Sequence, residues 1–183
     1  VYKRQGYEYL TQVVLLTPHR GELEILKKHR PICESPLEIH LGQALPKSNK
    51  MNLIVQKAVE LGVFEVHPFY STRTLTYYNV DQLNRRMRHW QKISQEASRQ
   101  SGRTKIPKVH FPMDFSQLLG SLPPDILKII LQKEDSRGSL KDSLRGNQKK
   151  KARIFFLVGP EGGFTPEEMA LAINYGFKPV NLG

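Results

Sequence analysis

The sequence predicts an α/β protein with a mostly parallel sheet and helices on both of its faces. Short apolar runs typical of buried strands alternate with segments of helical periodicity. The 183 residues suffice for one α/β domain and part of a second. Hydrophobic residues make up 39% and charged residues 25% of the chain. These are values of globular proteins, so we expect a packed core.

The first strands are expected at residues 8–27. The run YEYLTQVVLL alternates in polarity, and a turn at residues 17–21 separates it from ELEILKK. Two strands alone are marginally stable, so we interpret them as part of a β-rich module. Residues 31–36, which begin and end with proline, are the expected linker.

The remaining elements follow in alternation. Strand-like apolar runs are found at 37–41, 63–69, 106–111, 126–132, 153–158 and 179–182. Helical periodicity covers 48–62, with Ser48 or Asn49 as the N-cap and Gly62 as the stop. A second helix is expected from Asp81 to about residue 100, and a short one at 115–119. The polar and basic residues 133–151 are interpreted as a surface loop.

The charge distribution indicates a polyanionic partner. The chain carries a net charge of +11. Between Thr72 and Lys108 there are nine Lys or Arg residues and two acidic ones, which gives +7 in this segment alone. Such a stretch favours nucleic acid. The alternative is an ordinary solvated helix face. Trp90, at helical spacing, is interpreted as a core residue.

Several function classes are disfavoured by composition. Cys33 is the only cysteine, which precludes an internal disulfide and favours a reducing, cytoplasmic location. The six histidines lack a ligand spacing such as H-x-x-x-H, so we expect no metal site. No run approaches about 18 apolar residues, so we expect no membrane span. The chain starts at Val1 and stops at Gly183, and we interpret it as a fragment.

A glycine-rich loop, Gly159-Pro160-Glu161-Gly162-Gly163-Phe164, joins an apolar strand to a helix. It has neither the lysine of a P-loop nor the glycine spacing of a dinucleotide fold. Thr165 and Glu168 form a capping box that already serves the helix N-terminus. Phosphate is therefore disfavoured, and a neutral or cationic ligand such as S-adenosylmethionine fits better. A tight turn without a ligand is the alternative.

Four segments together resemble the ribosomal RNA small subunit methyltransferase E family, which belongs to the SPOUT class. They are KSNKMNLIVQKAVELG (47–62), PFYSTR (68–73), WQKISQEASRQSGRTKIPKV (90–109) and LVGPEGGFTPEE (157–168). The resemblance covers roughly residues 36–183, in the family's order and at compatible spacing. No single motif is sufficient, but their combination is highly specific.

The resemblance implies N3-methylation of a uridine in 16S ribosomal RNA, with S-adenosylmethionine as the methyl donor. It implies a homodimer, a C-terminal trefoil knot, and a PUA-like barrel of which residues 1–34 are the remnant before a methyltransferase domain at 35–183. In the family the last strand continues beyond Leu-Gly and completes the cofactor pocket, and a C-terminal helix finishes the knot. Because this chain ends at Gly183, we expect it to lack part of both.

The site residues are assigned by motif and by chemistry. The glycine motif and the chain end supply the cofactor positions, and Leu131 joins them because ligands of parallel sheets gather beyond the carboxyl ends of strands. These positions are Leu131, Gly159, Pro160, Glu161, Gly162, Gly163, Leu182 and Gly183. The expected RNA contacts are Arg73, Arg99, Gln100 and Lys105.

Arg103 and Glu96 are the candidate catalytic residues. A cation near the uracil carbonyl oxygens would stabilise the imidate that forms when N3 loses its proton, and Arg103 is the candidate for this role. Its alternatives are a phosphate contact or a cation at a helix C-terminus. Glu96 is the candidate proton acceptor, and its alternative is an ion pair with Arg99 or Arg103.

Three rival functions remain open at this point. One is a non-catalytic RNA-binding assembly factor on the same fold, and another is a SPOUT enzyme acting on another RNA. A nucleotide-hydrolysing enzyme is the third, although both phosphate motifs are missing.

Overall fold

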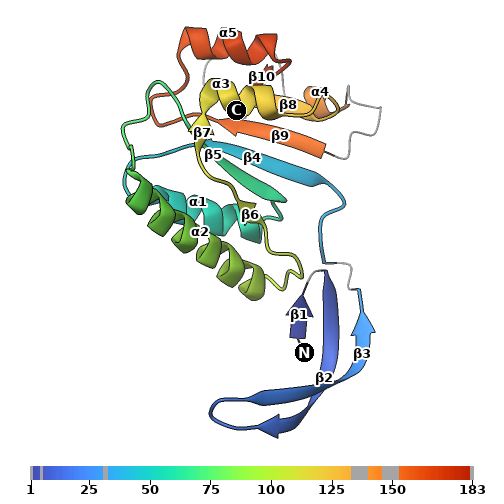
Figure 1. Cartoon of the computed structure of the whole chain (residues 1–183). Helices are drawn as coiled ribbons and strands as arrows, with labels where there is room; N and C mark the ends of the chain where they lie inside the picture. Colours follow the sequence, from blue (N-terminus) through green and yellow to red (C-terminus); the bar gives the residue numbers. More distant parts are fainter. Residues whose placement is uncertain (1, 5, 31–32, 133–139, 146–152, 182–183) are drawn as a thin grey trace.

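The computed structural model contains two sheets and five helices among the residues that it describes, which are all except 1, 5, 31–32, 133–139, 146–152 and 182–183 (Figure 1). The N-terminal sheet is antiparallel in the order β1-β2-β3. Its strands are β1 (Tyr2–Arg4), β2 (Tyr7–Leu16) and β3 (Gly21–His29). The predicted hairpin is confirmed, and β1 adds a strand that the sequence pattern did not indicate. The barrel to which we assigned it stays a prediction.

The second sheet has seven strands in the order β10-β8-β9-β4-β5-β6, with β7 paired to β5. All of its recorded strand pairs are parallel, as predicted. The strands are β4 (Glu38–Ala44), β5 (Glu65–Tyr70), β6 (Lys108–Val109), β7 (Met113–Asp114), β8 (Leu127–Leu131), β9 (Arg153–Val158) and β10 (Lys178–Val180). Parallel pairing places the carboxyl ends of neighbouring strands at one common edge.

Helices cover both faces of this sheet (Figure 1). One face carries α1 (Lys50–Glu60) and α2 (Val80–Gln100), and the other carries α3 (Phe115–Ser121) and α5 (Pro166–Asn174). Each face has its own apolar cluster. The first includes Met51, Val66 and Trp90, and the second includes Phe69 and Phe155. Trp90 is 1% exposed, which confirms it as a core residue.

Two local predictions were wrong. Helix α2 is capped by Asn79 rather than Asp81, because Asn79 and Gln82 form a reciprocal capping box. A short helix, α4 (Leu140–Arg145), lies within the stretch 133–151 that we interpreted as a loop. The remainder of that stretch lies outside the described residues. Within the described part of the chain, no helix combines the length and the apolar character that crossing a bilayer requires.

Candidate functional site

The glycine loop follows β9 at the carboxyl edge of the sheet and turns sharply into α5. The Gly163 amide donates to the Pro160 carbonyl at 2.9 Å, which closes a turn with Glu161 and Gly162 at its centre. Gly163 has a φ of 71°, a left-handed conformation that favours glycine. A Cβ at Gly159 would lie 3.0 Å from the Phe164 ring. The glycines therefore serve both the turn and a close approach of ring to backbone.

Two charged side chains hold the loop from outside. Lys50, the first residue of α1, donates to the Glu161 carboxylate at 2.8 Å. This hydrogen bond lowers the pKa of Glu161. Arg73, in the segment after β5, donates to the Gly162 carbonyl at 2.5 Å. In the structure the Glu161 side chain pairs with Lys50 and the Arg73 side chain bonds the loop backbone. The assignments of Glu161 to the cofactor and of Arg73 to RNA stay predictions.

The buried carboxylate of Glu168 connects α5 to the segment after β5. It accepts hydrogen bonds from the Thr72 amide at 2.8 Å, the Ser71 hydroxyl at 3.3 Å and the Thr165 amide at 2.9 Å. The Thr165 hydroxyl accepts from the Glu168 amide in return, which confirms the predicted capping box. The anion needed at this helix N-terminus is thus supplied by the protein.

The strand order brings three strand ends together beside the loop. Strands β10, β8 and β9 are neighbours, so the end of β8 at Leu131 lies between the ends of β9 and β10. The Gln132 amide donates to the Val180 carbonyl at 3.0 Å and extends this pairing. Leu131 and the glycine loop therefore share one edge, as predicted. Leu182 and Gly183 lie outside the described residues.

The chemistry of this edge suits an uncharged or cationic ligand. The space where a Gly163 side chain would stand is open, with no atom within 4 Å, so the loop backbone is accessible there. The α5 N-terminus is already occupied by Glu168 and Thr165, and the Glu161 carboxylate is paired with Lys50. An adenosine bound through main-chain groups and a sulfonium are both compatible with this arrangement.

Arg103 is placed elsewhere by the structure. It is 8% exposed, and its guanidinium bonds the Glu34 carboxylate at 2.7 and 3.0 Å. It also donates to the carbonyls of Val59 and Val63, at the junction of α1 and β5. Within one chain Arg103 therefore lies toward the amino ends of the strands, away from the glycine loop, and all three guanidinium nitrogens have partners. These contacts support a structural role within the single chain, and the catalytic role that we assigned to Arg103 stays a prediction.

Glu34 completes this buried pair. Burial alone would raise its pKa, but hydrogen bonds from Arg103 and from the Thr104 and Lys105 amides outweigh that effect and hold the pKa below the usual value. An ion pair between Arg103 and Glu96 was the alternative that we left open. Among the described residues, the ion-pair partner of Arg103 is Glu34 instead. Glu96 is exposed on α2, and no contact relates it to the glycine loop among the described residues.

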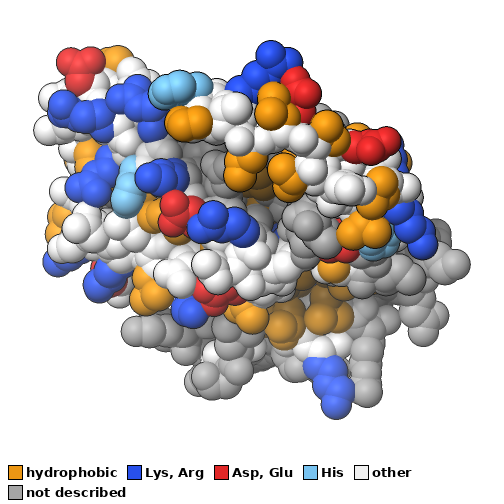
Figure 2. Space-filling model, turned by 90° about the horizontal axis from the view of Figure 1, so that it is seen from below, with side chains coloured by type: hydrophobic (Ala, Val, Ile, Leu, Met, Phe, Trp, Pro, Cys, Tyr) orange, Lys and Arg blue, Asp and Glu red, His pale blue; other side chains and the backbone are white. Residues whose placement is uncertain are grey.

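The remaining predicted RNA contacts lie on the surface at the end of α2. Arg99 and Gln100 are exposed in its last turn. Lys105 is also exposed, with its ammonium 5.7 Å from the centre of the Phe64 ring. Lys and Arg side chains gather on one part of the face seen in Figure 2, with histidines among them. A positive surface is therefore present, but Arg73 lies apart from these three residues.

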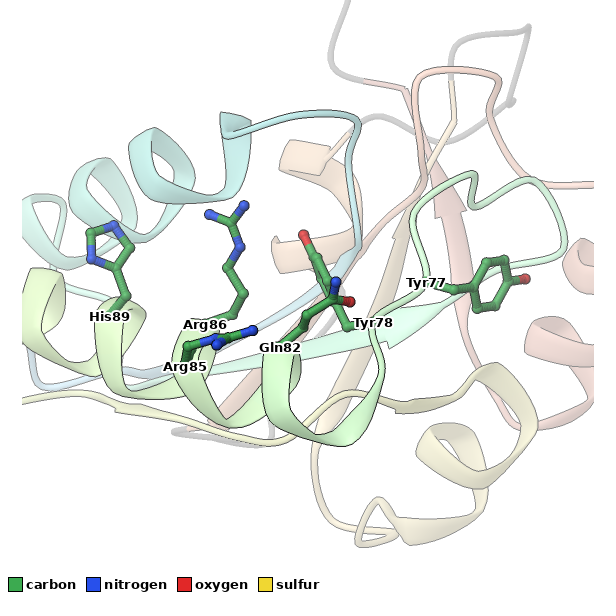
Figure 3. Close-up of a pocket in the computed structure, with 6 residues that line it drawn as sticks. All are labelled: Tyr77, Tyr78, Gln82, Arg85, Arg86 and His89. Atoms are coloured by element: carbon green, nitrogen blue, oxygen red, sulfur yellow. The ribbon is translucent and has the colours of Figure 1, made fainter.

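The sequence did not predict a hollow of about 560 Å³ that the structure shows at the start of α2 (Figure 3). It is lined by Tyr77, Tyr78, Gln82, Arg85, Arg86 and His89. Tyr77 stacks on Tyr70 at 5.3 Å between ring centroids and is still 67% exposed. Arg86 lies 5.7 Å from the Tyr78 ring. Two adjacent tyrosines at the start of a basic helix were the sequence signal that could have indicated this hollow. Aromatic rings and arginines together can stack on nucleic-acid bases.

Comparisons with known proteins agree with this arrangement. A family model for an RNA methyltransferase domain matches residues 33–183. A ribosomal RNA small subunit methyltransferase E from Buchnera aphidicola subsp. Schizaphis graminum is 30% identical over 183 residues, which is 100% of this chain and 72% of that protein. One from Mesomycoplasma hyopneumoniae is 29% identical, with 100% and 75% covered.

Solved structures give the same result. A ribosomal RNA small subunit methyltransferase E from Neisseria gonorrhoeae bound to S-adenosyl methionine matches with a TM-score of 0.85 and 33% identity, over 98% of this chain and 72% of that one. A putative methyltransferase from Legionella pneumophila in complex with the same cofactor matches with a TM-score of 0.85 and 29% identity, over 97% and 71%.

Proposed function

The chain belongs to the ribosomal RNA small subunit methyltransferase E family, and from that premise we propose that it methylates N3 of a uridine in 16S ribosomal RNA. S-Adenosylmethionine is the cofactor of this family's reaction. Its positive sulfonium supplies the methyl group, and the neutral thioether S-adenosylhomocysteine leaves. We further propose a homodimer, a C-terminal knot and, because the substrate is ribosomal, a cytoplasmic location.

One observation carries the proposal. The glycine loop, the end of β8 and the end of β10 meet at one edge, and the loop is fixed by Lys50, Arg73 and Glu168 while its backbone at Gly163 stays open. In-line methyl transfer requires mainly that donor and nucleophile be positioned. A loop that is held on both sides meets that requirement. None of its own side chains is suited to bind the phosphate groups of a nucleotide.

The segment that follows β5 relates this loop to the RNA surface. Arg73 contacts the glycine loop, and four residues later Tyr77 begins the hollow at the start of α2. We propose that RNA lies along α2 and that bases stack at Tyr77, with Arg85 beside them. Arg99, Gln100 and Lys105 extend the positive surface as backbone contacts. Glu96 stays the proposed proton acceptor. It can reach the uridine only if a second subunit contributes it to the site.

The direct test is transfer of labelled methyl from S-adenosylmethionine to unmodified small ribosomal subunits, followed by mapping of the product. We would test residues 1–183 and the longest form that the gene encodes. Label at N3 of one uridine supports the proposal. Label at another atom or in another RNA supports a different SPOUT activity. RNA binding without transfer by either form supports the non-catalytic assembly factor.

A further inference from the structure

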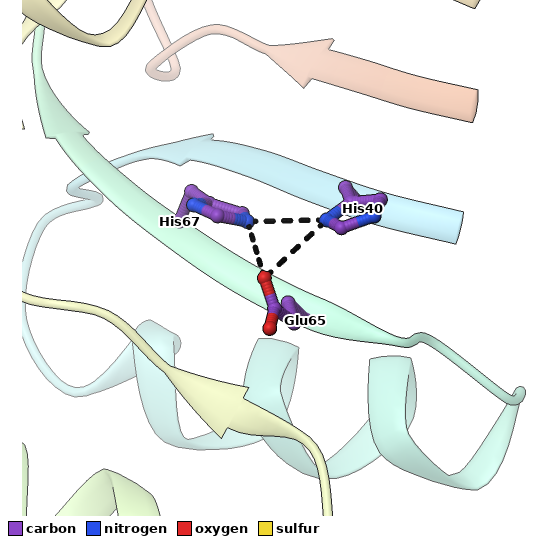
Figure 4. Close-up of side chains that lie close together, drawn as sticks. All are labelled: His40, Glu65 and His67. Atoms are coloured by element: carbon purple, nitrogen blue, oxygen red, sulfur yellow. Dashed lines mark hydrogen bonds and ion pairs between the residues drawn. The ribbon is translucent and has the colours of Figure 1, made fainter. Parts of the chain in front are cut away.

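Three side chains converge at the opposite, amino half of the sheet. His40 lies in β4, and Glu65 and His67 lie in β5 on the same face (Figure 4). His40 Nδ1 is 3.3 Å from His67 Nε2 and 3.5 Å from Glu65 Oε2, and His67 Nε2 is 3.3 Å from the same carboxylate oxygen. These atoms form a nearly equilateral triangle. Strand pairing creates it, because His40 is the register partner of Glu65.

With both imidazole rings neutral, hydrogen bonds cannot account for all three contacts of this triangle. The contact between the two histidines requires a proton on one of the facing nitrogens and a lone pair on the other. The nitrogen with the lone pair then faces the Glu65 carboxylate, which also offers only lone pairs. If both nitrogens carry protons, the two N–H groups face each other instead. Every neutral assignment therefore leaves one of the three contacts repulsive.

The three side chains are largely withdrawn from water. Those of His40 and His67 are 13% exposed, and that of Glu65 is 26% exposed. A neutral imidazole binds a metal ion through the lone pair of a ring nitrogen, and one ring nitrogen of each histidine faces the shared carboxylate oxygen.

The dimensions of the triangle agree with one face of a metal tetrahedron. Bonds of about 2.0–2.1 Å at the tetrahedral angle place neighbouring ligand atoms about 3.3–3.4 Å apart. The observed separations are 3.3, 3.3 and 3.5 Å. Two imidazoles and one carboxylate are a common zinc ligand set. Geometry and ligand type therefore indicate the same ion.

His110 provides the support that metal ligands usually have around them. It directly follows β6, and its Nε2 lies 3.0 Å from Glu65 Oε2. Its ring stacks on His67 with centroids 4.2 Å apart. Groups that hydrogen-bond a ligating carboxylate orient it and raise metal affinity. His110 therefore acts as a positioning residue for both Glu65 and His67.

We propose that His40, Glu65 and His67 bind one Zn²⁺ ion, with water in the fourth position and His110 holding the carboxylate. The ion joins β4 to β5 and, through His110, to the segment after β6. Its role is structural, because it lies toward the amino ends of the strands whereas the glycine loop lies at their carboxyl edge. The proposal is independent of the methyl transfer proposed above.

The test is a Zn²⁺ titration of metal-free protein at neutral pH in competition with a chromogenic chelator. We expect one ion per chain, and a rise in Tm on Zn²⁺ addition. His67→Gln should weaken binding at least about 100-fold, and His110→Gln about 10- to 100-fold. His19→Gln is the matched control, because His19 is exposed in the hairpin turn and should leave affinity unchanged.

Failure of wild-type protein to bind Zn²⁺, or equal affinity in His67→Gln, would overturn the proposal. Glu65→Gln is the second variant if His67→Gln does not fold, as judged by circular dichroism. Co²⁺ gives a test that needs no variant. Wild-type protein with Co²⁺ should show the intense visible absorption of a four-coordinate ion, and the faint spectrum of the aqueous ion would overturn the assignment.

Discussion

The two ends of the parallel sheet use polar side chains in opposite ways. At the carboxyl edge, Lys50, Arg73 and Glu168 hold a loop from outside and leave part of its backbone open. Toward the amino ends, Arg103 pairs with Glu34, and the histidines converge on Glu65 inside the fold. A charged residue in a recognisable motif is thus not automatically a ligand contact. Its partners decide whether it acts in structure or in chemistry.

The largest expected effect is that of Arg103→Ala on stability. The change leaves the Glu34 carboxylate and the carbonyls of Val59 and Val63 without their cation. Breaking a buried pair by removing one partner costs about 3–5 kcal/mol. Urea unfolding measures the loss. The control, Arg99→Ala, removes an exposed charge from the same end of α2 and should change stability by less than about 0.5 kcal/mol.

This comparison also separates the two roles of Arg103. A variant of nearly wild-type stability that binds RNA normally but transfers no methyl would show that Arg103 is catalytic. In that case the amino end would contribute to chemistry, and the contrast between the two ends of the sheet would fail.

A smaller loss is expected for Glu168→Ala. Three donors, the Ser71 hydroxyl and the Thr72 and Thr165 amides, lose their acceptor. Because buried donors without an acceptor are destabilising, we expect the free energy of unfolding to fall by about 2–3 kcal/mol. Affinity for S-adenosylmethionine, measured by calorimetry, should fall as well, because α5 and the glycine loop are no longer tied to β5. Glu167→Ala, on the exposed side of the same turn, should affect neither quantity comparably.

The role of Glu161 can be tested by exchanging charges. Glu161→Lys places a cation beside Lys50, so cofactor affinity should fall at least about tenfold while stability changes by less than about 1 kcal/mol. Combining it with Lys50→Glu restores an ion pair of reversed polarity. If Glu161 only positions the loop, the double variant regains affinity in calorimetry. No recovery would mean that the Glu161 carboxylate contacts the cofactor itself.

The smallest expected effect is a pH dependence from Glu34. Its pKa in the folded protein lies below the ordinary value of 4.5, so its contribution to stability is present in full above that value. The contribution is lost as the pH falls below 4.5 and through the folded pKa. The difference in unfolding free energy between wild type and Glu34→Gln should therefore shrink below pH 4.5. A difference that is constant over this range would contradict the assigned pair.

Local patterns were predictable from the sequence. The strand 153–158 and the capping box of Thr165 and Glu168 were predicted as they are observed, because each depends on residues close in the chain. The N-cap of α2 was misassigned because both Asn79 and Asp81 are good capping residues, and only geometry separates them. The location of the glycine loop at a shared strand edge followed from parallel topology alone.

Contacts between distant residues were not predictable. Arg103 meets Glu34 across 69 positions and Lys50 meets Glu161 across 111, and no periodicity connects them. His40 and His67 belong to different strands, so their spacing resembles no ligand motif. We expected the histidines to play ordinary roles, whereas strand register brings three of them to one carboxylate.

Hydrogen exchange with and without S-adenosylmethionine tests the central claim most directly. We predict that the cofactor slows exchange of amides at 159–164 and at the end of β8, while amides at 38–41 and 63–67 are unaffected in the same sample. Zn²⁺ should produce the opposite pattern. Protection by S-adenosylmethionine at the amino ends of the strands, with no change in the glycine loop, would contradict the assignment of the methyl donor site to the carboxyl edge.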